Sequence, residues 1–379
     1  MGAEQSTYEG PPEILEARDL SSVAKYMKSS ECRNVFVMLG AGVSTSAGIP
    51  DFRSPETGLY ANLARLNLPY PEAVFEINFF RENPKPFYTL ARELLPGRFR
   101  PTPTHSFIRL LADRSLLHTC FTQNIDTLER RAGVPSHKIV EAHGSFASQR
   151  CIDCSTVYDD EKMRTSLKTG VIAVCPECEG LVKPDIVFFG EALPQRFHHS
   201  VPQLRKADLL FVIGTSLTVQ PFASLATLVP DHCPRVLINL DAVGDLGSRG
   251  DDVLCLGKCD EVVRDLCKAL GWEAELDAAW KATENSVVDF DEIPPVDAQP
   301  DKGEDQRLRE EVEDITEKLE RILGAKFQED SQTSEDGSES RAESSAPASE
   351  EIPLVQEDNQ PLEVKVFVQK NTDEPKEKL

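Results

Sequence analysis

The chain has 379 residues and a formal net charge of −23, with 64 acidic residues against 41 basic ones. This acidic balance argues against a nucleic-acid backbone as the main partner. No run of about 18 apolar residues is present, so the sequence offers no candidate for a membrane-spanning helix. The 10 cysteines occur without a recognisable signal peptide, which predicts free thiols or a metal site in a reducing, intracellular compartment.

Residues 1–17 are predicted to form a flexible arm. They begin Met1-Gly2-Ala-Glu-Gln-Ser6, which matches the N-myristoylation pattern Met-Gly-x-x-x-Ser/Thr. A single myristoyl chain gives only reversible membrane binding, and no polybasic patch accompanies it here. The acidic residues of this arm are unlike a mitochondrial presequence. We therefore expect a cytoplasmic protein with transient membrane contact, while nuclear entry and the modification of Gly2 stay open.

Four short apolar runs predict buried strands of a parallel sheet, because both faces of such strands are covered. Long helix-compatible segments join these runs, which is the pattern of a doubly wound, Rossmann-like α/β fold. The runs are residues 35–39, 118–122, 207–213 and 235–240. The predicted sheet and its covering helices come from residues 18–53, 104–145 and 183–283, and residues 54–103 between them predict a helical insertion.

Polar clusters follow the predicted strands. They are Gly40 to Ser46 after the first strand, Gln123 to Asp126 after the second, Gly214 to Ser216 after the third, and Asn239 to Asp241 at the end of the fourth. In a parallel sheet these strand ends lie at one edge, where the ligands of such folds bind. The sequence therefore predicts one ligand site built from all four clusters.

The first cluster opens the segment GAGVSTSAGIPDFRS, residues 40–54. A strand that ends in glycines and serines usually presents backbone N–H groups to a phosphate. The spacing differs from the fingerprint of hydride-transferring enzymes, because the third glycine, Gly48, comes too late and no carboxylate stands near Leu63. The segment thus predicts a nucleotide that is bound in another way.

Residues 146–182 contain two Cys-x-x-Cys pairs, Cys151 with Cys154 and Cys175 with Cys178. Four thiolates at this spacing fit the tetrahedral zinc site of a ribbon. Because four cysteine ligands leave no open coordination position, the predicted zinc is structural. The alternative interpretation is a redox pair of Cys-x-x-Cys motifs.

Residues 284–379 are predicted to form an acidic, mostly disordered tail. From Lys281 onward the chain has 28 acidic and 12 basic residues. Stretches such as 331–349 offer too little apolar surface to offset the entropy of ordering. An apolar stripe over 308–322 and an alternating pattern over 362–368 are typical of a short helix face and a strand. We expect protein partners of the tail to bind there.

Together these motifs resemble the sirtuin family. The resemblance rests on residues 40–54, the cluster after the second strand and the cysteine pairs, and on three further motifs: Glu141-Ala-His143-Gly144, Lys183-Pro-Asp-Ile-Val-Phe-Phe-Gly-Glu191 and Gly214-Thr-Ser216. It runs from Leu20 to Trp280 and favours the class I branch that includes sirtuin two and sirtuin three. It implies an NAD-dependent protein-lysine deacylase with one structural zinc, which cleaves nicotinamide from NAD and transfers the acyl group from lysine to ADP-ribose.

The resemblance also implies the residues of the site. His143 is expected to be the general base, because the ordinary imidazole pKa of about 6.5 suits proton abstraction at neutral pH. Asn124 and Asp126 complete the expected catalytic set and would position the nicotinamide and ribose groups. Without the motif, His143 would be a capping or core histidine, and Asn124 with Asp126 a plain turn. The expected NAD-binding residues are Gly40, Ala41, Gly42, Val43, Ser44, Thr45, Asp51, Phe52, Arg53, Gln123, Asn124, Ile125, Asp126, Gly214, Thr215, Ser216, Asn239, Leu240, Asp241 and Cys259.

Several of these residues have an expected role toward NAD. The glycines would let the backbone approach the diphosphate. Ser44 and Thr45 would supply hydroxyl hydrogen-bond donors, and Arg53 would bring a positive charge toward the diphosphate. Phe52 would shield the reacting ribose carbon from water. Asn239 would meet the ribose on the adenosine side.

The segment Val187-Phe188-Phe189-Gly190-Glu191 is expected to bind the acylated substrate as an added strand. Its apolar side chains would line a tunnel for the acyl-lysine. The alternative is that Ile186 to Phe189 is a core strand. Sirtuins that remove succinyl groups carry Tyr and Arg three residues apart, whereas here Tyr60 is followed by Leu63, so we expect neutral acyl groups.

Two other functions stay open at this point. Mono-ADP-ribosyl transfer from NAD would use the same site as deacylation. A non-catalytic adaptor would use the zinc ribbon to bind partners or nucleic acid, but residues 146–182 offer no basic face. We therefore expect no direct nucleic-acid binding.

Overall fold

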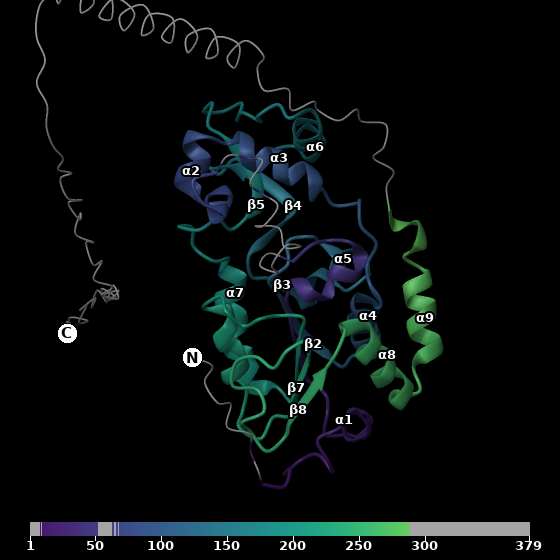
Figure 1. Cartoon of the computed structure of the whole chain (residues 1–379). Coiled ribbons are helices and arrows are strands. Elements are labelled where there is room, and N and C mark those ends of the chain that lie inside the picture. Colours follow the sequence, from purple (N-terminus) through teal and green to yellow (C-terminus); the bar gives the residue numbers. More distant parts are fainter. Residues whose placement is uncertain (1–7, 9, 52–62, 64–65, 67, 288–379) are drawn as a thin grey trace, which may run out of the picture. The chain divides into compact units, whose positions relative to one another are not determined.

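The computed structural model describes residues 8, 10–51, 63, 66 and 68–287 (Figure 1). Residues 288–379 of the acidic tail, the myristoylation motif around Gly2, and the predicted site residues Phe52 and Arg53 lie outside the described residues, as does Tyr60. Among the described residues, no helix combines the length and the apolar composition needed to cross a membrane.

A six-stranded parallel sheet forms the centre of the fold, with strand order β3-β2-β1-β6-β7-β8. This order confirms the predicted doubly wound fold, in which the strand order reverses between β1 and β6 while all strands stay parallel. The four predicted strands are present, whereas β3 and β8 at the two edges were not predicted. The bounds are β1 (Val35–Leu39), β2 (Leu117–Thr122), β3 (Ile139–Glu141), β6 (Leu209–Ile213), β7 (Arg235–Asn239) and β8 (Asp252–Leu256).

Helices cover both faces of the sheet. One face packs against α1 (Leu20–Met27), α4 (Pro103–Asp113), α8 (Cys259–Leu270) and α9 (Glu273–Lys281) (Figure 1). The other packs against α7 (Gln195–Ser200) and the 3₁₀ segments η6 (Val201–Lys206) and η7 (Phe222–Thr227). Alternate residues of β1 enter the two cores, with Val35 and Val37 on one side and Phe36 and Met38 on the other. This double coverage explains why the strand is apolar throughout.

A smaller module has an antiparallel pair of strands, β4 (Gly144–Cys151) and β5 (Val182–Ile186), with helix α6 (Asp160–Thr169) between them in sequence. The predicted helical insertion supplies the rest: η4 (Pro71–Phe75), α2 (Ile77–Glu82) and α3 (Lys85–Glu93). Both segments contribute side chains to one apolar core, so they form a single module rather than two.

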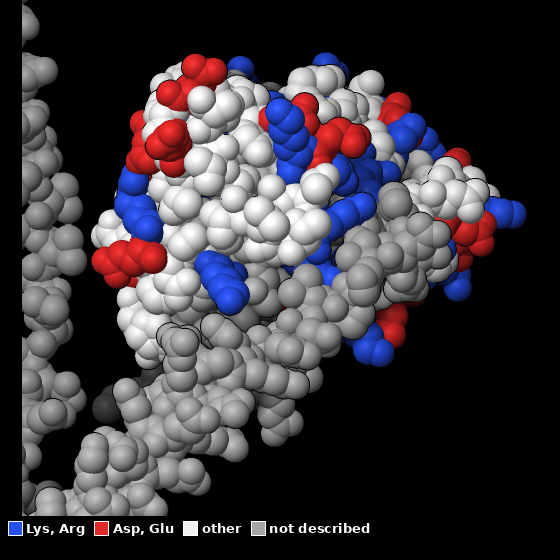
Figure 2. All heavy atoms as spheres, turned by 90° about the horizontal axis from the view of Figure 1, so that it is seen from above, with Lys and Arg blue, Asp and Glu red and all other residues white. Residues whose placement is uncertain are grey.

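Charged side chains of both signs are mixed on the surface of the end of the domain that carries the small module. Figure 2 looks down on it, and on the face that it presents Lys and Arg side chains are interspersed with Asp and Glu. A protein that binds nucleic acid usually gathers its basic residues on one face. The view therefore offers nothing to favour the interpretation as a nucleic-acid adaptor.

Residues 10–17 are anchored, which corrects the flexible arm predicted for residues 1–17. The Asp251 carboxylate accepts hydrogen bonds from the backbone N–H groups of Glu13 (3.1 Å), Ile14 (3.0 Å) and Leu15 (2.8 Å). The Leu15 side chain is buried in the core that α1 and α8 share with the sheet. The contacts join residues more than 200 positions apart, so the local sequence gave no sign of them.

Replacing Asp251 by Ala should release this arm. Three backbone N–H groups lose a charged acceptor, so we expect the free energy of unfolding to fall by about 1–3 kcal/mol. Denaturant titration measures the loss, and amide hydrogen exchange at residues 13–15 should quicken. The matched control is Asp231→Ala, because the Asp231 side chain is fully exposed. Unchanged exchange at residues 13–15 would contradict the anchoring role.

Candidate active site

The loops that follow β1 and β6 meet at the topological switch point, where the strand order of the sheet reverses. The Gly42 N–H donates to the Gly214 carbonyl at 2.8 Å, and the Gly40 N–H donates to the Ile213 carbonyl at 3.1 Å. A Cβ atom on Gly40 would lie 2.6 Å from the Gly214 oxygen, and one on Gly42 would lie 2.8 Å from its Cα. Both glycines are therefore required for the contact between the two loops, in addition to any approach to a phosphate.

Loop residues after β1 form two 3₁₀ turns, η1 (Ala41–Val43) and η2 (Thr45–Ala47). The buried Ser44 hydroxyl donates to Asp126 Oδ2 at 2.6 Å, and the exposed Thr45 hydroxyl donates to the Gly42 carbonyl at 3.1 Å. Both hydroxyl groups thus have acceptors inside the protein. Val43 is a core residue, 1% exposed, so only its backbone faces the loop surface.

The cluster after β2 packs against this loop. Asn124 Nδ2 donates to the Gly40 carbonyl at 3.1 Å, and Asp126 Oδ1 accepts from the N–H of Leu128 at 2.9 Å. The second bond closes the turn that leads into the short helix α5 (Leu128–Arg131), so Asp126 has the turn-forming role of the alternative interpretation as well as its contact with Ser44. Gln123 Oε1 accepts from the Thr215 hydroxyl at 2.7 Å, which joins the clusters after β2 and β6.

His143 lies between β3 and β4, beside this cluster. Its Nδ1 is 3.1 Å from the Gln123 carbonyl oxygen. Because a carbonyl only accepts, this contact assigns the proton of the neutral ring to Nδ1 and the lone pair to Nε2. His143 is half-buried and caps no helix. The capping histidine of the described chain is His105, at the start of α4.

The segment after β5 is tied to His143 through the backbone. The Val187 N–H donates to the His143 carbonyl at 2.8 Å, and the Phe189 N–H donates to the Phe75 carbonyl at 2.8 Å. The Phe189 side chain is 48% exposed, whereas Phe188 is 1% exposed and packs against Phe87 with ring centroids 4.9 Å apart. The expectation that Phe188 lines a tunnel is therefore wrong, because this side chain fills the core of the small module.

Glu191 closes the same segment into a loop. Its Oε2 accepts from the Phe188 N–H at 2.8 Å and lies 2.9 Å from Nζ of the buried Lys183. The ammonium also lies 4.6 Å from the centre of the Phe188 ring. Burial lowers the pKa of Lys183, and the Glu191 charge opposes that shift. Sequence reasoning assigned Glu191 to substrate binding and did not find its partner.

The cluster after β7 lies farther along the same edge. Asn239 Nδ2 donates to the Asp241 carbonyl at 2.8 Å, and Leu240 is 68% exposed. The Cys259 thiol is 3.8 Å from the Ile238 carbonyl oxygen, and burial raises its pKa to about 12. This thiol is therefore not a reactive nucleophile at neutral pH.

Asp260 is a further residue of this edge that the sequence analysis missed. Its carboxylate accepts from the Ser46 hydroxyl at 2.6 Å and from the Thr104 N–H at 3.0 Å. It thereby joins the start of α8 to the loop after β1 and to α4. The contact with Ser46 spans 214 positions, so no local pattern indicates it.

A pocket opens between the sheet edge and the small module. Its polar wall comes from the loops after β1 and β2, and its apolar wall includes residues of the small module. The lining residues are Ala41, Ser44, Ile49, Pro50, Leu94, Asn124, Ile125, Asp126 and Phe146. An apolar pocket with a few converging polar groups is the usual form of a small-molecule site.

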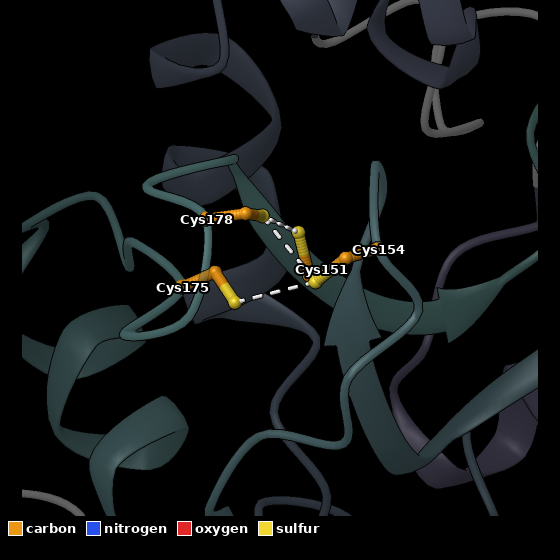
Figure 3. Close-up of side chains that lie close together, drawn as sticks. All are labelled: Cys151, Cys154, Cys175 and Cys178. Carbon is orange, nitrogen blue, oxygen red and sulfur yellow. Dashed lines mark hydrogen bonds between the residues drawn. The ribbon is translucent and has the colours of Figure 1, made fainter.

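The four predicted zinc ligands converge in the small module (Figure 3). Cys151 ends β4, Cys154 follows it, and Cys175 and Cys178 come from a second loop, with all four side chains directed at one another. The sulfur atoms all lie within 4.8 Å, and three pairs lie between 3.3 and 3.6 Å. Tetrahedral zinc with bonds of about 2.3 Å holds its sulfur ligands about 3.8 Å apart. The donor set therefore fits zinc.

Replacing Cys175 by Ser should abolish this metal site. The zinc-to-protein ratio, measured by elemental analysis, should fall from one toward zero, and the small module should unfold at lower denaturant because zinc binding contributes to its folding. Cys255→Ser, on β8 and outside the cluster, is the matched control and should keep its zinc. A Cys175→Ser protein with full zinc content would refute the assignment.

Comparison with known proteins shows the family of this chain. Residues 40–221 match the model of the Sir2 family. The chain is 55% identical over 327 residues to the NAD-dependent protein deacetylase hst2-1 of Emericella nidulans, a match that covers 85% of this chain and 89% of the relative. It is 44% identical over 317 residues to sirtuin-2 of Danio rerio, covering 78% and 83% of the two chains. It is 50% identical over 259 residues to sirtuin-3 of Mus musculus, covering 68% and 78%. The chain therefore belongs to the Sir2 family, in the branch of sirtuin-2 and sirtuin-3.

Proposed function

We propose that this protein is an NAD-dependent protein-lysine deacetylase. The observation that carries the proposal is the position of His143, whose Nδ1 contacts the Gln123 carbonyl while its own carbonyl accepts from Val187. The ring of His143 thus contacts the NAD-side loop, while its backbone holds the substrate-side segment. The relatives in Emericella nidulans and Danio rerio are both named NAD-dependent protein deacetylases, which supports the proposal.

NAD is the co-substrate: its nicotinamide leaves, and its ADP-ribose receives the acyl group. The loops after β1, β2, β6 and β7 hold it at the carboxyl edge of the sheet, with Asn124 and Asp126 at the pocket lined by Phe146. The edge fits a dinucleotide because the polar loops after β1 and β2 converge on one apolar-walled pocket, and the loop after β6 is bonded to both. Asp51 and the residues Phe52 and Arg53 extend this site, as the family resemblance implies.

His143 acts as the general base through Nε2. The Nδ1–H donor to Gln123 fixes the tautomer and the orientation of the ring, and the carbonyl stabilises the imidazolium that forms when Nε2 takes a proton. Asn124 and Asp126 act beside it as polar groups that the loop contacts hold in place. Such a base typically contributes about 10²–10⁴-fold to the rate.

The acylated peptide lies along residues 187–191 as an added strand. Four of the N–H groups of this segment, those of Val187, Phe188, Phe189 and Glu191, already donate inside the protein. The peptide therefore pairs chiefly with carbonyl groups of the segment. The exposed Phe189 side chain is the apolar surface available to it.

The proposed catalytic domain spans residues 18–283, with residues 10–17 packed against it. The sheet with its helices carries the NAD site, and the small module, held by one structural zinc, carries the substrate-side segment. Residues 284–379 are the acidic tail, which we assign to protein partners. The acyl-lysine proteins themselves are the substrates.

The proposal extends to the myristoylation of Gly2 and to a cytoplasmic location with transient membrane contact. The support for both is the sequence pattern Met-Gly-x-x-x-Ser. Incorporation of a clickable myristate analogue into the cellular protein, and its loss in Gly2→Ala, is the expected result. An unlabelled protein would rule out the modification.

His143→Ala should abolish turnover while leaving peptide binding in place. With NAD and an acetylated peptide, we expect kcat for nicotinamide release and deacetylation to fall by about 10²–10⁴-fold. His199→Ala, at an exposed position on α7, is the control and should keep its kcat. An unchanged kcat in His143→Ala would refute the role of general base. Labelled ADP-ribose on protein without acyl transfer would instead indicate ADP-ribosyl transfer.

An acetylated peptide should react faster than a succinylated one. Leu63 is 2% exposed in the apolar core that also holds Ile125 and Phe146, so it offers a succinyl carboxylate no cation. A buried, unpaired charge is unfavourable, and we expect kcat/KM for the succinylated peptide to be lower by about 10²-fold or more. Mass spectrometry of both peptides in one mixture measures the ratio. Equal rates would contradict the preference for neutral acyl groups.

A further inference from the structure

Three titratable side chains meet beside the Gln123–Asp126 loop, away from the zinc site. One ring nitrogen of His105 and one carboxylate oxygen each of Asp126 and Glu129 lie within 4.8 Å of one another. His105 is fully buried, Glu129 is 1% exposed and Asp126 is 9% exposed. They come from the first turn of α4, from the loop after β2 and from α5.

Two atoms of this cluster have no hydrogen-bond partner in the part of the chain that the structure describes. They are His105 Nε2 and Glu129 Oε1. Burying such groups without a partner is unfavourable, and burying two carboxylates side by side is more so. A bound metal ion or a proton retained by one of the acids would relieve that repulsion.

The histidine argues against a metal ion. His105 Nδ1 accepts from the Thr102 N–H at 3.2 Å, as part of the capping box that begins α4. The proton of the neutral ring is therefore on Nε2. Neither ring nitrogen offers a lone pair to a metal, so the cluster is stabilised by a proton.

Burial, more than hydrogen bonding, decides which acid keeps the proton. Asp126 accepts from the Ser44 hydroxyl at 2.6 Å and from the Leu128 N–H at 2.9 Å. Both bonds favour the ionised form of Asp126. Glu129 also accepts two, from the Thr122 side chain and from its own N–H. Its Oε1 has no partner, however, and Glu129 is 1% exposed against 9% for Asp126, so desolvation makes Glu129 the acid that stays protonated.

Glu129 is also joined to the loop that carries Asn124. The Thr122 hydroxyl oxygen accepts from the Asn124 N–H at 3.1 Å, and the same side chain forms a hydrogen bond with the Glu129 carboxyl. We propose that Glu129 is a positioning residue for the Asn124–Asp126 loop, and that it acts as a neutral acid which leaves Asp126 as the single carboxylate of the cluster. The inference rests on the proposed function, because Asn124 and Asp126 belong to the proposed NAD site.

The electrostatic surroundings agree with this assignment. Burial, followed by the charge of Asp126, raises the pKa of Glu129 to about 8, and burial lowers the pKa of His105. The other titratable or charged groups that face Glu129 are Cys120 on β2, Glu141 on β3 and Arg130 on α5. Arg130 pairs with Glu141 at 2.7 Å, so its charge is already balanced.

The raised pKa makes stability depend on pH. In the unfolded chain Glu129 loses its proton near its ordinary pKa of 4.5, and in the folded chain it does so at about 8. Between these values the folded state binds one proton more, so its stability falls as pH rises through the window and levels off above about pH 8. Ionised Glu129 would place a second negative charge beside Asp126 and displace the loop.

Glu129→Gln tests this pH dependence of stability, because a glutamine side chain resembles the neutral acid at every pH. We expect the unfolding equilibrium constant of the wild type to rise relative to that of Glu129→Gln by up to ~10-fold per pH unit between about pH 5 and 8. Denaturant titrations at fixed pH intervals measure the ratio. Glu161→Gln, at an exposed position on α6, is the control and should not show this window. A ratio that does not change with pH would overturn the proposal.

The pH profile of kcat/KM for NAD separates positioning from a purely structural role. The wild type should lose activity above about pH 8, and Glu129→Gln should lack that decline, because it has no proton to lose there. The comparison concerns the shapes of the two profiles. Identical shapes would overturn the positioning role. Absence of all turnover in the wild type would refute the proposed deacetylase, while the unfolding experiment would still test the proton on Glu129.

Two measurements on the wild type need no variant. In a chain with ¹³C-labelled glutamate carboxyls, NMR should show one carboxyl that titrates near pH 8. Elemental analysis should give one zinc per chain. No carboxyl titrating above about pH 7, or a second metal ion bound per chain, would overturn the proposal.

Discussion

The contact between the loops after β1 and β6 is the constraint on which the site depends. Gly40 and Gly42 approach Gly214 so closely that a methyl group on either would overlap its backbone. This approach brings Asn124 onto the Gly40 carbonyl and Ser44 onto Asp126. The polar loops after β1, β2 and β6 therefore form one connected surface, and the glycines are required by the protein itself before any ligand binds.

The small module has one core built from two distant segments. Phe188 lies at its centre, against Phe75, Phe80 and Phe87 from the helical insertion. The same residue begins the loop that Lys183 and Glu191 close. The substrate-side segment is therefore positioned by apolar packing on one side and by its backbone bond to His143 on the other.

Much of this could be predicted from the sequence, because the decisive signals are local. The apolar runs that form β1, β2, β6 and β7 are covered on both faces, and the cysteine spacing is fixed by zinc geometry. The edge strands β3 and β8 were not predicted because their apolar runs are short: β3 has only 3 residues, and the run in β8 extends only from Val253 to Leu256. Phe188 was misassigned because an apolar residue in a motif gives no sign of which side it faces. The anchoring by Asp251, the bridge by Asp260 and the cluster of His105 with Glu129 join distant residues, so only the fold could show them.

Anchoring of residues 10–17 fixes the place on the domain surface from which any group attached upstream of them extends. Asp251 stands immediately before β8, at the amino end of a parallel strand, while the NAD-side loops follow the carboxyl ends. A strand of five residues separates the two edges by about 16 Å. A tether, affinity tag or lipid attached upstream would thus leave from the rim opposite the catalytic opening, and acylated proteins could enter while the enzyme is held at a surface.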